Sequence, residues 1–122
     1  MSFEIQEIAG VRTLICAPEG AVIAGEREAA DLLGEAFSAG AKLVAIPLAR
    51  LPQAFLDLKT GLAGAVLQKF VNYERRVVLV GDVTEACARS EPLAAFVRES
   101  NRGRNVWFVR VLAELEDRLG GA

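Results

Sequence analysis

Residues 42–47 read Lys-Leu-Val-Ala-Ile-Pro, and this short apolar run is the strongest indication of the fold class. It lacks the alternation of apolar and polar side chains that a strand with one solvated face shows. Such a run is typical of a strand that is covered on both faces of a sheet. Residues 75–80 repeat the pattern, and residues 105–109 form the last strand that the sequence predicts.

Segments with helical periodicity lie between and after these strands. Their apolar residues recur three or four positions apart, which places them on one face of a helix. The apolar positions are Ala29, Leu32, Leu33, Ala36 and Phe37 in the first helix, Ala63, Val66, Leu67, Phe70 and Val71 in the second, Leu93, Phe96 and Val97 in the third, and Val111, Leu112, Leu115 and Leu119 in the last. Strands that alternate with helices are expected to pair in parallel through right-handed crossovers.

The beginning of the chain has a different pattern. Residues 3–9 and 12–16 are short runs rich in apolar and β-branched residues, and the Ala9-Gly10 break between them predicts a hairpin turn. We therefore expect an α/β fold with one mixed sheet of about five strands, in which an opening antiparallel hairpin precedes alternating helices and strands. The length suits one α/β domain over residues 1–122, because a chain of this size buries enough surface for one core.

Composition limits the classes of function. Hydrophobic residues make up 52% of the chain and charged residues 25%, which is the balance of a globular protein. A formal net charge of -2 provides no broad positive field, so we expect no nucleic-acid partner. Histidine is absent, which excludes serine and cysteine triads of the ordinary type. We therefore assign no catalytic residue.

The cysteines and the apolar runs indicate the cellular compartment. Cys16 and Cys87 belong to no Cys-x-x-Cys pair, so we expect reduced core residues and neither a disulfide nor a zinc site. The N-terminus lacks the pattern of a signal peptide, and the longest apolar run, around residues 43–48, is too short to cross a bilayer. These features predict a cytoplasmic protein without a membrane partner, and no sequence motif indicates a cofactor or a metal.

Residues 55–73 contain an acidic residue, a hydroxyl group and two glycines, a combination that the packing of a buried helix does not require. Asp57, Lys59, Thr60 and Gly61 precede an amphipathic helix in this segment. The order of strand, short loop, Asp57, Thr60-Gly61 and helix resembles the STAS (SpoIIAA-like) domains of anti-sigma-factor antagonists. That resemblance implies a STAS-like fold and a phosphorylatable hydroxyl at Thr60, which acts as a regulatory switch. A helix N-terminus with Lys59 beside it would suit the added phosphate.

The same residues have a purely structural interpretation. Asp57 or Thr60 is then the N-cap of the helix, a role for which both residue types are well suited. Caps occur on most helices, whereas regulatory hydroxyls are rare, so we favour the cap over the switch.

A second resemblance covers most of the chain. Residues 57–64 read Asp-Leu-Lys-Thr-Gly-Leu-Ala-Gly, and together with residues 67–73, 80–82 and 99–103 they are similar to a family of uncharacterised bacterial proteins. That family has no assigned activity, so the similarity bears on the fold alone.

One face of the helix after Thr60 carries small and neutral polar residues. Gly61, Gly64, Gln68 and Asn72 recur at helical spacing on its expected outer side. Such a strip allows another backbone to approach closely, which suits a protein partner or a second copy of the chain. The alternative is that the strip lies under a neighbouring loop, and the sequence leaves both interpretations open.

A further pair of residues indicates a second type of site. Gly81-Asp82 follows a predicted strand at its carboxyl end, where open α/β sheets bind ligands. Asp57, Lys59 and Asp82 would then share a cleft. In the polar stretch before the last strand, Arg102 and Arg104 would clamp a phosphate or the carboxylate of a partner. The simpler interpretation is that Asp82 belongs to a turn and that Arg102 complements the C-terminus of a helix.

The sequence thus supports two functional hypotheses. The first is a non-enzymatic regulatory or protein-interaction module that resembles STAS domains, acts through the N-terminus and outer face of the helix over residues 60–73 and carries a switch at Thr60. The second is a small-molecule binder or weak enzyme that uses a cleft near Asp57 and Asp82.

Overall fold

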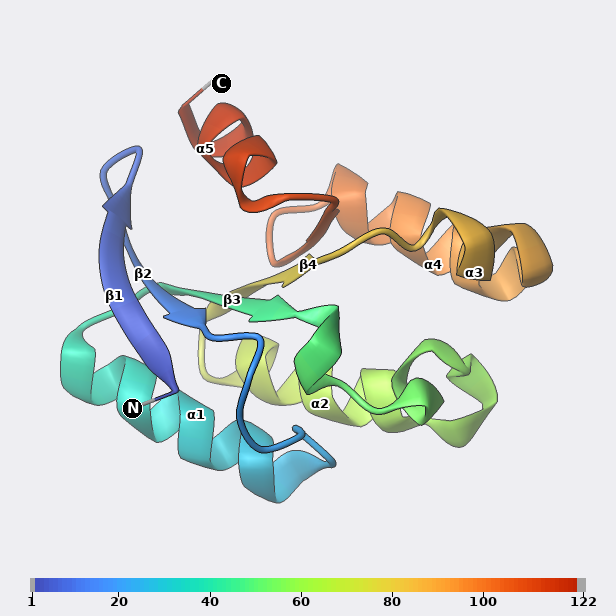
Figure 1. Ribbon diagram of the computed structural model, residues 1–122, viewed down its shortest axis with the longest axis horizontal. Coiled ribbons are helices and arrows are strands. Elements are labelled where there is room, and N and C mark those ends of the chain that lie inside the picture. Colours follow the sequence, from blue (N-terminus) through green and yellow to red (C-terminus); the bar gives the residue numbers. More distant parts are fainter. Residues whose placement is uncertain (1, 121–122) are drawn as a thin grey trace.

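The fold was obtained as a computed structural model, which describes residues 2–120 (Figure 1). The strands are β1 (Phe3–Ile8), β2 (Val11–Cys16), β3 (Leu43–Pro47), β4 (Arg76–Val80) and β5 (Val106–Val109). The helices are α1 (Glu26–Ala39), α2 (Leu62–Asn72), α3 (Thr84–Arg89), α4 (Glu91–Arg102) and α5 (Leu112–Gly120). Three short 3-10 turns, η1 (Leu48–Arg50), η2 (Gln53–Leu56) and η3 (Leu58–Thr60), connect β3 to α2.

The strands form one mixed sheet within residues 2–120, in the order β1-β2-β3-β4-β5. β1 and β2 are antiparallel, and every later pair is parallel, with Thr13 opposite Leu43 and Val44 opposite Val77. The α/β fold, the five-stranded mixed sheet and the alternation of helices and strands are therefore confirmed. Neighbours along the chain are also neighbours in the sheet, so the crossovers advance across it in one direction.

The β1-β2 hairpin has the turn that its sequence predicts. Ala9 and Gly10 both have positive φ angles, 48° and 82°. Two central residues with positive φ define the type I′ turn, whose twist matches that of the flanking strands. The short connection also fixes the register, in which Ile8 lies opposite Val11.

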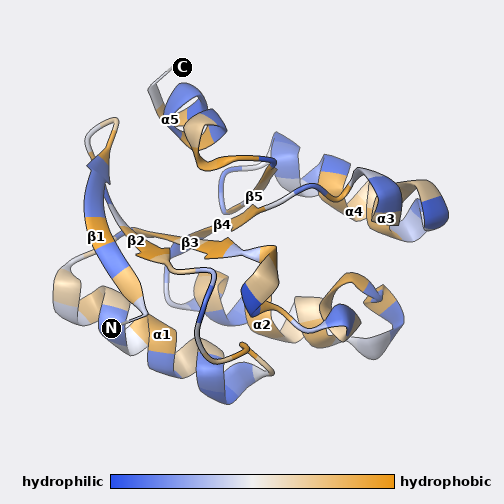
Figure 2. Cartoon of the chain, in the orientation of Figure 1, coloured by the Kyte–Doolittle hydropathy of each residue, from blue (hydrophilic) through white to orange (hydrophobic). Residues whose placement is uncertain are grey.

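The larger hydrophobic core lies on the sheet face that α1, α2 and α4 cover. Inward side chains of the strands meet the apolar stripes of α1 and α2, and Phe96 and Val97 of α4 pack at the margin. Buried members include Leu14, Val44, Ile46, Val77, Leu79, Leu33, Ala36, Val66, Leu67 and Phe70. Figure 2 shows strongly hydrophobic residues along β2, β3 and β4, with hydrophilic residues mixed into β1 and the helices.

The opposite face has a thinner cover. α5 lies on this side of the sheet, away from α1 and α2 (Figure 1). Leu115 of α5 is fully buried against a smaller cluster that also contains Ile8, Leu43, Val78, Trp107 and Val109. The Glu114 carboxylate fixes the start of α5, because its Oε1 accepts hydrogen bonds from the backbone N–H groups of Arg110 and Val111 at 2.7 and 3.3 Å.

Arg50 holds the loop between β2 and α1 in place. Its side chain is buried, and its guanidinium donates to the carbonyls of Ala21 at 2.7 Å and Ala17 at 3.0 Å. Gly20 has a φ of +133°, and a Cβ there would lie 2.9 Å from Arg50 Cζ. The glycine therefore leaves room for the guanidinium, a tertiary contact that no sequence pattern indicated.

Two local predictions differ from the structure. Helix α3 was not expected, because it is short and lies directly before the Ser90 cap of α4.

Cys16 is buried in the larger core, as predicted, and burial raises its pKa to about 11. Cys87 was expected to be a core residue, but it is only partly buried on α3. Both cysteines are free.

Candidate functional site

The turns before α2 and the helices α3 and α4 form the two walls of an open groove. We call it the Thr60 groove. Gln53, Ala54, Leu56, Asp57 and Thr60 line one wall, and Ala86, Arg89, Ser90 and Leu93 line the other. Asp57 and Thr60 thus line the same groove, which places a carboxylate, a hydroxyl and a guanidinium on one surface.

The Thr60 hydroxyl is engaged in the local backbone. Its Oγ1 lies 2.8 Å from the carbonyl oxygen of Ala54 and 2.9 Å from that of Asp57, so it can donate to either. It also accepts a hydrogen bond from the backbone N–H of Leu62 at 3.2 Å. Thr60 therefore satisfies one of the free N–H groups at the start of α2. The N-cap of α2 is Gly61, however, so the prediction that Asp57 or Thr60 occupies that position is wrong.

The residues on either side of Thr60 complete the turn. The Asp57 carboxylate accepts a hydrogen bond from the backbone N–H of Lys59 at 3.2 Å and caps η3. Gly61 occupies the N-cap position of α2 with a φ of +76°, a conformation that glycine adopts without strain. The switch interpretation of Thr60 remains a prediction.

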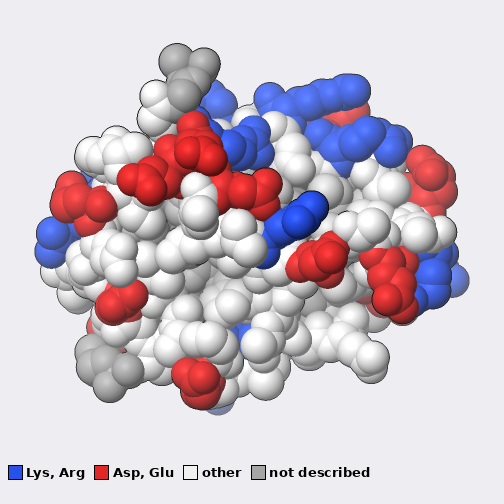
Figure 3. Space-filling view, turned by 45° about the horizontal axis from the view of Figure 1, so that its top comes forward, with Lys and Arg blue, Asp and Glu red and all other residues white. Residues whose placement is uncertain are grey.

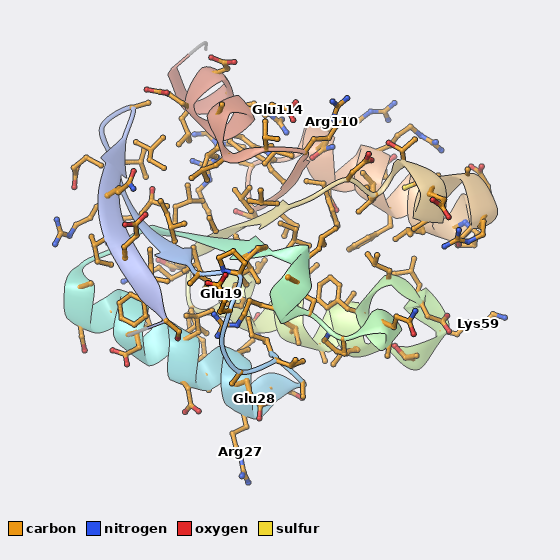
Figure 4. The ribbon with its side chains drawn as sticks, in the orientation of Figure 1. Glu19, Arg27, Glu28, Lys59, Arg110 and Glu114 are labelled. Atoms are coloured by element: carbon orange, nitrogen blue, oxygen red, sulfur yellow. The ribbon has the colours of Figure 1, made fainter. Side chains whose placement is uncertain are left out.

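The cation that shares the groove with Thr60 is Arg89, not Lys59. Figure 4 shows the Lys59 side chain extending away from the body of the protein into solvent. Arg89 lies on the facing wall, where its Nη1 is 2.7 Å from Glu85 Oε1. Sequence reasoning missed Arg89 because it missed α3. The available signal was Asp82, whose carboxylate accepts from Thr84 N–H at 2.9 Å and marks the start of that helix.

The small and polar residues of α2 form a continuous exposed strip. Gly61, Gly64, Gln68 and Asn72 are all exposed, so no loop within residues 2–120 covers them. Gln68 Nε2 donates to Asn72 Oδ1 at 2.8 Å. We call these four residues the α2 strip.

Two exposed aromatic rings extend the α2 strip. Gln68, Asn72 and Tyr73 line one shallow groove, so the strip is continuous with Tyr73. Tyr73 is 51% exposed and Phe37 of α1 is 46% exposed, and their rings lie edge to face with centroids 6.2 Å apart. The Arg75 guanidinium lies over the Phe37 ring at 4.0 Å. These aromatic residues did not figure among the predicted site residues.

The residues of the second hypothesis are separated. Asp57 lines the Thr60 groove, whereas Asp82 is not among its lining residues. Asp82 is exposed, and the hydrogen bonds from Thr84, with a smaller contribution from the Arg110 charge, lower its pKa. Arg102 Nη1 lies 3.4 Å from Glu99 Oε1 on the same helix. Asp82 and Arg102 thus have the local roles of a turn residue and a paired helix-end cation.

Comparison with known protein families gives a match over most of the chain. A family model described as "Domain of unknown function (DUF4180)" matches residues 8–119, which is most of the chain. This agrees with the similarity to an uncharacterised family, but it does not test the motif at residues 57–64 or the STAS resemblance. No curated protein and no solved structure matches the chain. Within residues 2–120, none of the helices combines the length and the apolar character needed to span a bilayer.

Proposed function

The chain belongs to the DUF4180 family, and we propose that it is a non-enzymatic regulatory module that binds a protein partner through the α2 strip. The observation that supports this proposal is the exposure of Gly61, Gly64, Gln68 and Asn72 in continuity with the aromatic pair Phe37 and Tyr73.

The chemistry of this surface suits a protein partner. The glycines allow a second backbone to approach closely, and the two amides offer donors and acceptors for a polar contact. Half-exposed aromatic rings are the residue type that contributes most binding energy at protein interfaces. Tyr73 and Phe37 would supply that contribution beside the strip.

The charge of the α2 strip favours a second copy of the chain as the first partner to test. Its four residues are neutral. The nearby Lys69 is positively charged, but its Nζ lies 3.9 Å from Glu26 Oε1, and the Glu26 carboxylate offsets that charge. A neutral surface can meet its own copy without repulsion between like charges. Another neutral protein surface is the alternative partner.

Thr60 directly precedes Gly61, the first residue of the α2 strip, so a phosphate added to Thr60 would lie at one end of the proposed binding surface. Phosphorylation would remove the hydroxyl proton that Thr60 donates to Ala54 or Asp57 and would add about two negative charges. Arg89 across the groove is positioned to attract that charge. We propose that phosphorylation would shift the turn that leads into α2 and so alter partner binding.

The oligomeric state tests the proposed surface. Gly64→Arg places a bulky charge in the α2 strip at a position where an added Cβ meets nothing within 4 Å. Ala113→Arg is the matched control, because Ala113 is an exposed small residue on α5. Sedimentation velocity should show a wild-type dimer that Gly64→Arg dissociates and Ala113→Arg keeps.

A monomeric wild type would call for the same pair of variants in a crosslinked pull-down from the native cytoplasm. A specific partner lost with Gly64→Arg and retained with Ala113→Arg supports the proposal. Identical partners for both variants would reject the α2 strip as the interface.

Thr60 requires its own variants. Thr60→Glu should alter partner binding while its circular dichroism melt stays close to that of the wild type. If Thr60→Ala alone collapsed the fold, the residue would be an essential cap and the switch would be rejected.

Binding of a small molecule in the Thr60 groove is a second candidate function. The observation that favours it is the meeting of Asp57, Thr60 and Arg89 around one groove. A ligand that binds there stabilises the native state, so a ligand screen should give thermal shifts that Asp57→Ala abolishes. Asp82→Ala should leave these shifts unchanged, because Asp82 does not line the groove.

A further inference from the structure

Three arginines gather around the chain's single tryptophan on the thinner side of the sheet. Arg76 begins β4, Arg104 precedes β5 and Arg118 belongs to α5. The guanidinium carbons of Arg76 and Arg118 lie 4.4 and 4.0 Å from the Trp107 ring centroid. Arg76 Nε donates to the backbone carbonyl of Arg104 at 2.7 Å, so the Arg104 backbone lies beside the Arg76 guanidinium, and the Arg104 charge lowers the pKa of Arg76. We call these three residues the Trp107 arginine cluster.

The three arginines of the cluster lack ion-pair partners in the described part of the chain. Among residues 2–120, no carboxylate forms an ion pair with Arg76, Arg104 or Arg118. Arg98 and Arg102 on the neighbouring α4, in contrast, pair with Glu91 and Glu99. Burial lowers the pKa of Arg76, and the charges of Arg104 and Arg118 lower it further. Arg104 and Arg118 therefore repel the charge of Arg76, and no carboxylate of residues 2–120 forms an ion pair that would offset this repulsion.

Backbone contacts hold the cluster in a fixed geometry. Trp107 Nε1 donates to the Gly103 carbonyl at 2.8 Å, which fixes the ring. Arg118 Nη2 donates to the Asn101 carbonyl at 2.7 Å, and its Nη1 lies 3.3 Å from Asn101 Oδ1. These acceptors are neutral oxygen atoms, so they orient the guanidinium without removing its charge.

Several N–H groups of the Trp107 arginine cluster remain available as hydrogen-bond donors to a ligand. The terminal nitrogens of Arg76 and the whole guanidinium of Arg104 make no hydrogen bond within the described part of the chain. Arg104 is exposed and Arg76 partly so, and an anion can therefore reach them. Guanidinium groups present planar pairs of N–H donors, which match the oxygens of a phosphate group.

We propose that the Trp107 arginine cluster binds the phosphate dianion of inorganic phosphate or of a small phosphorylated molecule. A dianion would satisfy free donors and offset the repulsion among three like charges. A long polyanion fits less well, because the chain carries a net charge of -2. Figure 3 also shows basic side chains grouped at the upper right of the imaged face, with acidic side chains at several other places on it, rather than one broad basic surface.

Tryptophan fluorescence provides a direct test, because Trp107 is the only tryptophan and contacts two of the three arginines. The wild-type protein is titrated with sodium phosphate and with glycerol 3-phosphate, against sodium chloride at matched ionic strength. The proposal predicts a saturable change with at least one phosphate compound and none with chloride. Tighter binding of glycerol 3-phosphate would indicate a phosphorylated small molecule, and tighter binding of phosphate would indicate the free ion.

Arg104→Ala is the decisive variant, since its side chain makes no hydrogen bond or ion pair within residues 2–120 and its loss should leave the fold intact. Losing one charge-assisted contact should weaken phosphate affinity by about tenfold or more. Arg27→Ala is the matched control, because Arg27 extends from α1 into solvent (Figure 4). Equal responses to phosphate and chloride, or unchanged affinity in Arg104→Ala, would overturn the proposal.

Discussion

The two faces of the sheet differ in how much helix covers them. On one face, α1, α2 and α4 enclose a broad core that includes Phe70, Val66 and Leu33. On the other, α5 is the helix that packs on the sheet within residues 2–120, and Leu115 is its fully buried residue. The first face has the area to supply most of the folding energy. The second leaves Arg104 and Arg118 exposed and Arg76 partly exposed beside the buried Trp107.

The largest expected effect comes from a cavity in the broad core. Phe70 is fully buried on α2 and packs against the sheet. Phe70→Ala removes a ring from a closely packed site and should lower the free energy of unfolding by about 3–5 kcal/mol. Urea denaturation monitored by circular dichroism measures this loss. A loss well below that of Leu115→Ala would contradict the assignment of the main core to this face.

A smaller loss is expected on the thinner face. Leu115→Ala removes the buried anchor of α5 and should cost about 2–3 kcal/mol, near the lower end for leucine truncation, because few residues surround the cavity. Labelling of the Cys16 thiol separates the two faces, since Cys16 lies in the broad core. The two variants are compared at urea concentrations that lie equally far below their own unfolding midpoints. Under these conditions, the Cys16 thiol should be labelled faster in Phe70→Ala than in Leu115→Ala.

Alkaline pH should weaken the broad core through Cys16. Burial raises its pKa from 9.0 to about 11, with the Arg50 charge acting in the opposite direction. Below pH 9 the thiol is neutral in both states, and between pH 9 and 11 the unfolded state alone loses the proton. Wild-type stability should therefore fall by about 2–3 kcal/mol over this range relative to Cys16→Ala. Parallel pH profiles of the two proteins would show that the thiol is not buried.

The smallest effect is expected in the Trp107 arginine cluster. Arg104 is exposed, and its charge lowers the pKa of Arg76. Arg104→Ala relieves this repulsion, so the free energy of unfolding should stay within about 0.5 kcal/mol of the wild type or rise slightly. Urea melts at low and high salt measure the difference. A loss of more than about 1 kcal/mol would assign Arg104 a structural role and weaken the case for a ligand site.

The elements that sequence patterns predicted best are those with strong local signals. The apolar runs of β3 and β4, the periodicity of α1 and α2, and the Ala9-Gly10 turn are all found in the structure. Ser90 caps α4 as predicted, with its Oγ accepting a hydrogen bond from Leu93 N–H at 3.3 Å. Helix α3 escaped prediction because its six residues are too few to show a period.

The candidate site was less accessible to sequence reasoning. Asp57 and Thr60 were identified from their place before a helix, but their neighbour Arg89 comes from α3, on the far wall of the groove. The aromatic pair joins the end of α1 to the end of α2, and the arginine cluster joins three elements. Contacts between distant segments leave no periodic trace in the chain.

Local chemistry in the sequence was enough to specify which segments form strands and helices and which of their faces are apolar, because backbone geometry imposes periods of 2 and 3.6 on buried positions. Only the packed structure determined that Arg76 and Arg118 meet at Trp107, and that Arg50 is buried among backbone carbonyls. Charge and hydrogen bonding depend on distances in space, and folding sets those distances between residues far apart in the chain.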